Sequence, residues 1–216
     1  MNDHKSKRHI LVLGASGNVG REVVSMAVSL GHQVTAVSRN ISEVLDKSPD
    51  GVVLRDLDVF DLEGLIDASR RVDAIVSCLG PGSDGNLNLL FEGMGCVIAA
   101  ARANHIERIL GIGGAGLLEM PDGEGLWKDD AKFPSFLRDI SAAHYKSLLL
   151  LQKSGINWTF VCPPMMQSGP VTCEYRTRTN MLLPGGFAIR FSDVAHFLVT
   201  EIESREFINE KVAIAY

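Results

Sequence analysis

The sequence predicts an α/β fold in which about seven mostly parallel strands carry helices on both faces of the sheet. Short apolar runs alternate with longer amphipathic segments, as a series of β-α-β units requires. The apolar runs are continuous, which is typical of parallel strands that are covered on both sides. The 216 residues, of which 46% are hydrophobic and 22% charged, have the composition of an ordinary globular protein with a sizeable core.

The first half of the chain contains the predicted elements in regular order. The first strand is an apolar run at residues 9–13, and the first helix, residues 19–30, follows it. In that helix the apolar residues recur at helical spacing, and Gly31 ends it. The other elements predicted here are strands at 33–38, 52–54 and 73–79, and a helix that Asp61 precedes and that runs to Ala68.

The second half continues this alternation and then becomes less regular. Residues 87–104 are rich in small residues, which predicts a long helix packed closely on the sheet. Residues 113–133 are rich in glycine, proline and acidic residues, and a loop of that length is a candidate lid or pocket wall. Residues 165–186 show no regular pattern. The remaining predicted elements are strands at 108–112, 157–161 and 211–215, and helices at 141–153 and from Ser192 to about Glu203.

We expect one domain over residues 1–216, with a small substrate-pocket region formed by about 114–140 and 165–190. The net charge of -5 gives no reason to expect nucleic acid as a partner, and no run approaches the roughly 20 apolar residues that span a bilayer. The four cysteines are far apart, which indicates buried free thiols in a reducing compartment rather than disulfides or a metal site. The expectation is a cytoplasmic monomer or homodimer that binds a small-molecule substrate and no metal.

A glycine-rich turn, Gly14-Ala15-Ser16-Gly17-Asn18-Val19-Gly20, lies directly between the first strand and the first helix. In such a turn the first glycine permits the bend, the second lets the backbone approach a diphosphate, and the third lets helix and strand pack closely. The N–H groups at the helix start and the helix dipole then hold the anion. The turn predicts a Rossmann-type dinucleotide site; a turn that serves only packing is the alternative.

The end of the second strand indicates which dinucleotide the site would take. Sites specific for NAD usually carry an acidic residue there, whereas this chain reads Val37-Ser38-Arg39-Asn40. Arg39 can pair with a 2′-phosphate, and Ser38 can donate a hydrogen bond to it. We therefore expect NADP(H) to be preferred over NAD(H); the alternative interpretation of Arg39 is an ordinary surface arginine.

With these segments the chain resembles the atypical short-chain dehydrogenase/reductase group. Within that group it is most similar to the NmrA-like NAD(P)H-binding proteins described as NADH-flavin reductases, which are related to biliverdin-IXβ (flavin) reductase. The resemblance covers nearly the whole chain. Besides the glycine turn it rests on Arg55 to Val59, Gly113 to Gly116, Ser154 to Thr159, Pro163-Pro164 and Val212 to Tyr216, in that order.

The resemblance implies further cofactor contacts, each at the carboxyl end of a strand, where open α/β sheets bind their ligands. They are Asp58 and Val59 at the adenine, Cys78, Leu79 and Gly80 along the ribose and phosphates, Gly113 and Gly114 at the nicotinamide, and Cys162, Pro163 and Pro164 over its amide.

The usual catalytic residues of the wider superfamily are missing from this chain. The serine position falls at Gly114, and the Tyr-x-x-x-Lys pair falls at Ile140 and His144. Tyr145-Lys146 is no substitute, because the tyrosine must stand one helical turn before its lysine to share a face. His144 could bind the nicotinamide ribose or donate a proton, with an ordinary pKa of about 6.5; a structural or solvent-facing histidine is the alternative.

Aromatic and methionine side chains in the irregular segments can line a pocket for a flat ring, although each of them alone is compatible with ordinary packing. The candidate substrate residues are Trp127, Phe133, Met165, Met166, Tyr175 and Arg176. The function that fits is an NADPH-dependent oxidoreductase that transfers hydride from the nicotinamide to a small conjugated acceptor, flavin-like or quinone-like. Two alternatives stay open: a non-catalytic NADP(H)-binding redox sensor, and an NAD(P)-dependent isomerase or dehydratase.

Overall fold

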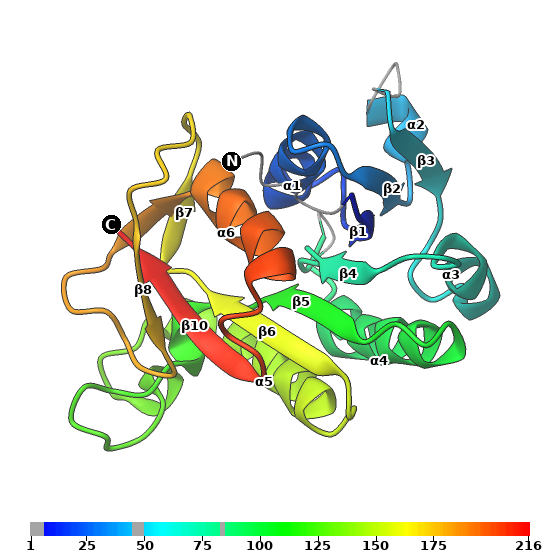
Figure 1. Ribbon diagram of the computed structural model, residues 1–216. Coiled ribbons are helices and arrows are strands. Elements are labelled where there is room, and N and C mark those ends of the chain that lie inside the picture. The colour runs from blue at the N-terminus through cyan, green and yellow to red at the C-terminus, as the bar shows by residue number, and fades with distance from the viewer. Residues whose placement is uncertain (1–6, 45–49, 83–84) are drawn as a thin grey trace.

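The computed structural model describes residues 7–44, 50–82 and 85–216. Its centre is an eight-stranded sheet with the strand order β3-β2-β1-β4-β5-β6-β10-β8 (Figure 1). Seven of these strands are parallel, and β8 pairs antiparallel with β10 at one edge. The prediction of about seven mostly parallel strands is confirmed, and the sequence had missed only the edge strand β8 of this sheet. The strands are β1 (His9–Leu13), β2 (Gln33–Ser38), β3 (Val52–Asp56), β4 (Ala74–Ser77), β5 (Arg108–Ile112), β6 (Asn157–Cys162), β8 (Arg176–Thr179) and β10 (Glu210–Ala215).

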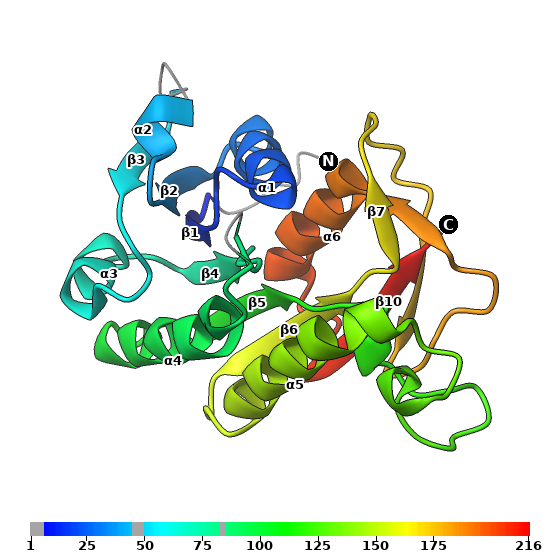
Figure 2. The same cartoon turned by 180° about the vertical axis from the view of Figure 1, so that it is seen from behind.

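Helices cover both faces of the sheet, as predicted. Helices α1 and α6 pack together on one face, and α3, α4 and α5 cover the other; Figures 1 and 2 show the two layers from opposite sides. In β1, Ile10 and Val12 belong to the first core and Leu11 and Leu13 to the second, which explains why the strand is continuously apolar. The helices are α1 (Asn18–Ser29), α2 (Ile41–Val44), α3 (Leu62–Ala68), α4 (Asn88–Ala103), α5 (Arg138–Gln152) and α6 (Phe191–Ser204), of which α2 was not predicted.

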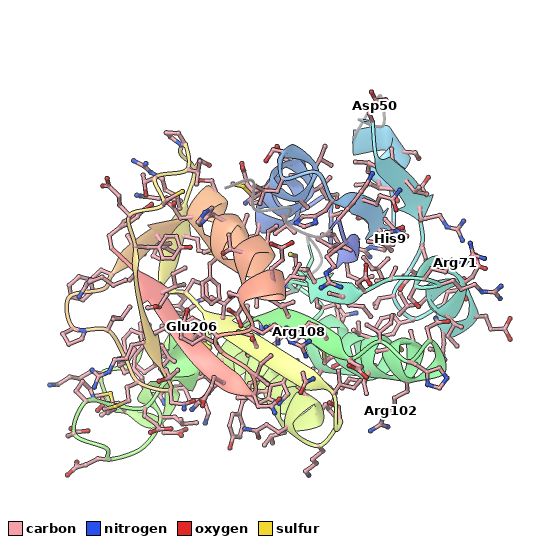
Figure 3. The ribbon with its side chains drawn as sticks, in the orientation of Figure 1. His9, Asp50, Arg71, Arg102, Arg108 and Glu206 are labelled. Atoms are coloured by element: carbon pink, nitrogen blue, oxygen red, sulfur yellow. The ribbon has the colours of Figure 1, made fainter. Side chains whose placement is uncertain are left out.

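A buried ion pair fixes the C-terminal end of α6 to the sheet. Arg108 of β5, which Figure 3 labels, and Glu201 of α6 are 4% and 1% exposed. A guanidinium nitrogen of Arg108 lies 2.9 Å from the carboxylate of Glu201. Arg108 also donates to the hydroxyl of Thr159 on β6, at 2.6 Å. Burial lowers the pKa of Arg108 to about 10, so it remains charged at neutral pH. Removing one partner would leave the other charge buried and uncompensated, so this end of α6 is held firmly.

The segments that were predicted to be irregular contain short elements. Residues 165–186 include β8 and also β7 (Met165–Gln167), which pairs in parallel with β9 (Ala188–Arg190) in a second, two-stranded sheet. The candidate lid, residues 113–133, contains the 3-10 turns Ala115–Leu117 and Trp127–Asp129. The guanidinium of Arg138 donates to three carbonyl groups of that loop, at 2.9–3.4 Å, which ties the loop to the start of α5.

The four cysteines Cys78, Cys96, Cys162 and Cys173 carry free thiols. Cys162 is buried as predicted and Cys78 and Cys96 are half-buried, but the prediction of buried thiols is wrong for Cys173, which is exposed in the segment between β7 and β8. Among the described residues, no helix is both long and apolar enough to cross a membrane.

Candidate functional site

A cleft of about 510 Å³ opens at the carboxyl ends of β1, β2, β4 and β5. The strand order reverses between β1 and β4, and ligands of open α/β sheets bind at such a switch point. Many of the predicted site residues meet here. Those that line the cleft are Gly14, Ser16, Gly17, Asn18, Val19, Ser38, Arg39, Asp58, Val59, Cys78, Leu79, Gly80, Gly113, His144 and Met166.

The glycine turn has the geometry of a diphosphate cradle. A Cβ at Gly14, where φ is +69°, would lie 2.5 Å from the carbonyl oxygen of Cys78, and a Cβ at Gly20 would lie 2.1 Å from that of Gly14. The fold itself therefore requires these two glycines. Gly17 differs, because a Cβ there would meet only the Gly14 oxygen, at 3.2 Å, and the residue lines the cleft.

The start of α1 offers free hydrogen-bond donors to an anion. Gly17 is the N-cap, no side chain caps the first turn, and that turn holds no acidic residue. The first N–H groups of a helix have no partner inside the helix, and its dipole attracts negative charge to this end. The turn thus fits a dinucleotide diphosphate.

The end of β2 presents a hydroxyl and a guanidinium to the cleft. The Ser38 hydroxyl lies 2.6 Å from that of Ser16, which joins the end of β2 to the glycine turn. Arg39 is exposed on the cleft, and its guanidinium makes no hydrogen bond or ion pair within the described parts of the chain. Asp56, the β3 partner of Ser38, accepts hydrogen bonds from the backbone N–H and hydroxyl of Ser42, which lower its pKa. That carboxylate is therefore held at the start of α2, and it is not among the residues that line the cleft.

At the predicted adenine side, Asp58 lines the cleft and accepts a hydrogen bond from the N–H of Phe60, at 3.0 Å. Cys78 and Gly80 follow along the end of β4. Burial raises the pKa of the Cys78 thiol to about 12, so this cysteine stays protonated. A Cβ at Gly80 would meet open space, which leaves room for a ligand along this strand end.

The opposite end of the cleft, which we call the α5 end, is formed by Gly113, Ile140, His144, Met166 and Phe191. Burial lowers the pKa of His144 to about 4, so its imidazole is neutral at physiological pH. The ring stands edge-on to Phe160, with centroids 6.5 Å apart, and forms no hydrogen bond with the rest of the described chain. Apart from this neutral imidazole, the α5 end carries no titratable side chain. The sequence did not indicate Phe191, because no motif marks it. Ile140 was noted only as the position where the superfamily's tyrosine is missing.

Other predicted cofactor residues are not part of the cleft lining. Ala15 and Cys162 are fully buried, and Pro163 is buried with its carbonyl bonded to the N–H of Ala115. Those outside the lining are Ala15, Gly20, Gly114, Cys162, Pro163 and Pro164. Gly114 and Pro164 are half-buried, and the structure leaves all six outside the lining of the cleft.

The structure does not bring the predicted substrate residues together. Trp127 and Phe133 pack against each other edge-to-face, with centroids 5.1 Å apart. The Tyr175 hydroxyl bonds to His196 on α6, at 2.8 Å, and Arg176 donates to the carbonyl of Tyr216. Met165 is 78% exposed at the rim, and only Met166 of the six lines the cleft.

Comparison with known proteins agrees with this geometry. Residues 14–205, which include the turn, both walls of the cleft and α6, match the NAD(P)H-binding family. This chain belongs to that family. The NAD(P)H-binding chain is 29% identical over 210 residues to the uncharacterized protein YwnB of Bacillus subtilis, covering 94% of this chain and 96% of YwnB.

Two further relatives have names that describe reductases. A crystal structure of a "putative NADH-flavin reductase" from Streptococcus pneumoniae superposes with a TM-score of 0.83 at 26% identity, over 96% of this chain and 99% of that one. Isoflavone reductase of Pisum sativum is 24% identical over 73% of this chain, which spans 50% of the length of that enzyme. The family is thus NAD(P)H-binding and reductase-like.

The low pKa of His144 predicts how stability depends on pH. In the unfolded chain the imidazole takes up a proton near its ordinary pKa of about 6.5, whereas in the folded protein it stays neutral down to about pH 4. The unfolded state binds more protons in this interval, so the free energy of unfolding falls as the pH is lowered. We expect His144→Asn to reduce this fall by about 2 kcal/mol, measured by urea denaturation at about pH 7 and about pH 4.5. His105 is exposed and provides the control. If His105→Asn reduced the fall in the free energy of unfolding as much as His144→Asn does, His144 would not be its source.

Proposed function

We propose that this NAD(P)H-binding protein is an NADPH-dependent oxidoreductase whose acceptor is a small conjugated molecule, flavin-like or quinone-like. The observation that carries the proposal is the composition of the α5 end of the cleft. It presents apolar side chains, a glycine and a neutral imidazole, where the wider superfamily would place tyrosine and lysine. A flavin or quinone fits such a site, because these acceptors need little proton transfer from the protein.

The other end of the cleft supports NADPH as the cofactor. The N–H groups at the start of α1 would hold the diphosphate, and Arg39 with Ser38 would hold the 2′-phosphate. Gly113, Ile140 and His144 would then face the nicotinamide, which when bound would supply a hydride to the acceptor.

The side chains at the α5 end would orient the acceptor and exclude water. Ile140, Met166 and Phe191 are half-buried and offer apolar surface to a flat ring. His144, being neutral, would hydrogen-bond a ribose hydroxyl rather than deliver a proton. Water would then protonate the product. Of the substrate-pocket region expected at 114–140 and 165–190, we therefore assign the start of α5 and β7 to the acceptor.

The test is NADPH oxidation by the purified protein with a flavin or a quinone as the acceptor. Met166→Glu places a charge in the apolar wall. The acceptor would have to bury this carboxylate when it packs against the wall, which is costly, so turnover should fall at least about 10-fold. Met165→Glu, one residue away and 78% exposed, is the matched control and should leave turnover unchanged. Tight NADPH binding without oxidation of any acceptor would reject the proposal in favour of a redox sensor.

A further inference from the structure

Asp193 is a buried carboxylate on the side of α6 that faces the segment after β7. It is 0% exposed and accepts four hydrogen bonds, none of them from a cation. Two come from the backbone N–H groups of Thr172 and Cys173, both at 2.8 Å. The others come from the hydroxyls of Thr172, at 2.9 Å, and Tyr216, at 2.6 Å. Burial alone would raise the pKa of this carboxyl, but these hydrogen bonds lower it below its usual range, so it is ionised.

Neighbouring contacts extend this network across the start of α6. The hydroxyl oxygen of Tyr216 also accepts a hydrogen bond from the backbone N–H of Arg190, at 3.1 Å. The backbone N–H of Tyr216 donates to the carbonyl of Ala188, at 3.2 Å. The Arg190 side chain donates to the carbonyl of Pro170 at 3.1 Å, and the Ser192 hydroxyl donates to that of Gly169 at 2.9 Å. Four segments are thus tied together: β7 with the residues after it, β9, the start of α6 and the end of β10. Figures 1 and 2 both show the C-terminal end beside β7.

The same segments carry the acceptor wall of the cleft. Phe191 follows Arg190 directly and stands two residues before Asp193. Met166 pairs with Ile189 in the small β7–β9 sheet, a few residues before the segment that Asp193 holds. A sheet of two three-residue strands is weak by itself, so the positions of these two side chains depend on what anchors it.

We propose that Asp193 and Tyr216 are positioning residues that hold Met166 and Phe191 against the acceptor, and so determine how tightly the acceptor binds. This proposal rests on the proposed function, because it assigns the wall to the acceptor. The glycine turn, Ser38 and Arg39 lie on other elements and share none of these hydrogen bonds, so we expect the network to affect the binding of the acceptor more than that of NADPH.

Tyr216→Phe tests the proposal by removing one hydroxyl while keeping the ring. We expect the KM for the acceptor to rise about 5- to 20-fold, while kcat and the Kd for NADPH change less than about 2-fold. Asp193→Asn should have a larger effect, because an amide that keeps its oxygen on the two N–H groups turns its NH2 toward the hydroxyls of Thr172 and Tyr216, which now both donate to the carboxylate. Asp193→Ala should have the largest effect of the three. If Asp193 and Tyr216 only stabilised the fold, the three variants would lower the melting temperature without raising the KM for the acceptor in this order.

The matched control is Ser204→Ala at the other end of the same helix. Ser204 also donates its hydroxyl to a buried carboxylate, that of Glu201, at 2.5 Å, but it lies far from the wall. Its loss should lower the melting temperature without changing the KM. An equal rise in KM for Ser204→Ala and Tyr216→Phe, or an unchanged KM in Tyr216→Phe, would overturn the proposal.

Amide hydrogen exchange separates this proposal from the proposed function. In Tyr216→Phe the amides of residues 165–173 should exchange faster, while those of the glycine turn should not. If the wild-type protein reduces no acceptor, the proposed function fails, and exchange alone decides the positioning role. Unchanged exchange of residues 165–173 in Tyr216→Phe would then reject the positioning role, and faster exchange confined to these residues would support it.

Discussion

Replacing Arg39 with glutamate is expected to lower the affinity for NADPH about 100-fold, or about 2.7 kcal/mol, and that for NADH less than about 3-fold. The guanidinium is exposed on the cleft and free of partners within the described residues, so it can meet a 2′-phosphate without breaking a contact. A carboxylate in its place would repel that phosphate, whereas NADH carries only a hydroxyl there.

Titration of both dinucleotides into the two proteins by calorimetry measures this difference. Arg70→Glu is the control for the change in net charge, because Arg70 is exposed beyond α3 and pairs with Asp67. Its effect on either dinucleotide should be small at physiological salt, where such distant charges are screened. Equal losses for NADPH and NADH in Arg39→Glu would show that Arg39 does not bind the 2′-phosphate.

Much of the fold could be predicted because local pattern and tertiary environment agree in the central strands. Strands β1, β2, β4 and β5 are covered on both faces, so their apolar runs are unambiguous. The glycine turn was equally clear, because its three glycines stand at the expected spacing directly between a strand and a helix. The structure supplies the reason at Gly14 and Gly20, where a side chain would collide with backbone.

The acceptor side could not be predicted in the same way, because its elements are short and their side chains are exposed. Strands β7 and β9 have three residues each, too few for an alternating pattern to be recognised. Met165 and Met166 are identical in type, but strand pleating turns one outward and the other into the cleft. Trp127 and Phe133 pack on each other, a choice of partner that composition does not determine.

The network around Asp193 illustrates the same limit at longer range. Its partners Thr172 and Tyr216 are separated from it by 21 and 23 positions along the chain. No short motif joins them, and the sequence marked Asp193 only as part of a helix start. Asp56 is a similar case, since its carboxylate lies at the strand end next to Ser38 but bonds to Ser42. Which acid faces the cofactor site therefore depends on a hydrogen bond that the sequence does not reveal.

Alanine at Gly20 and alanine at Gly17 should separate folding from cofactor binding. In Gly20→Ala the new Cβ would lie 2.1 Å from the Gly14 oxygen, so backbone must move, and we expect a loss of about 3 kcal/mol or more in the free energy of unfolding. In Gly17→Ala the backbone already has a φ of −74° that alanine accepts, so stability should change by less than about 1 kcal/mol. The added methyl group lies where the diphosphate would approach, and the NADPH affinity should fall at least about 10-fold, or about 1.4 kcal/mol.

Gly95→Ala is the control for substituting a glycine as such. Gly95 lies inside α4, where a Cβ would meet open space, so alanine should stabilise the fold by about 0.5–1 kcal/mol and leave NADPH binding unchanged. Urea denaturation and NADPH titration of the three variants give the comparison. A methyl group added where the backbone touches its ligand must weaken binding. If Gly17→Ala bound NADPH as tightly as the wild type, the amides at the start of α1 would therefore not be the diphosphate site. Equal stability of Gly20→Ala and Gly17→Ala would in turn show that the third glycine is not held against the turn.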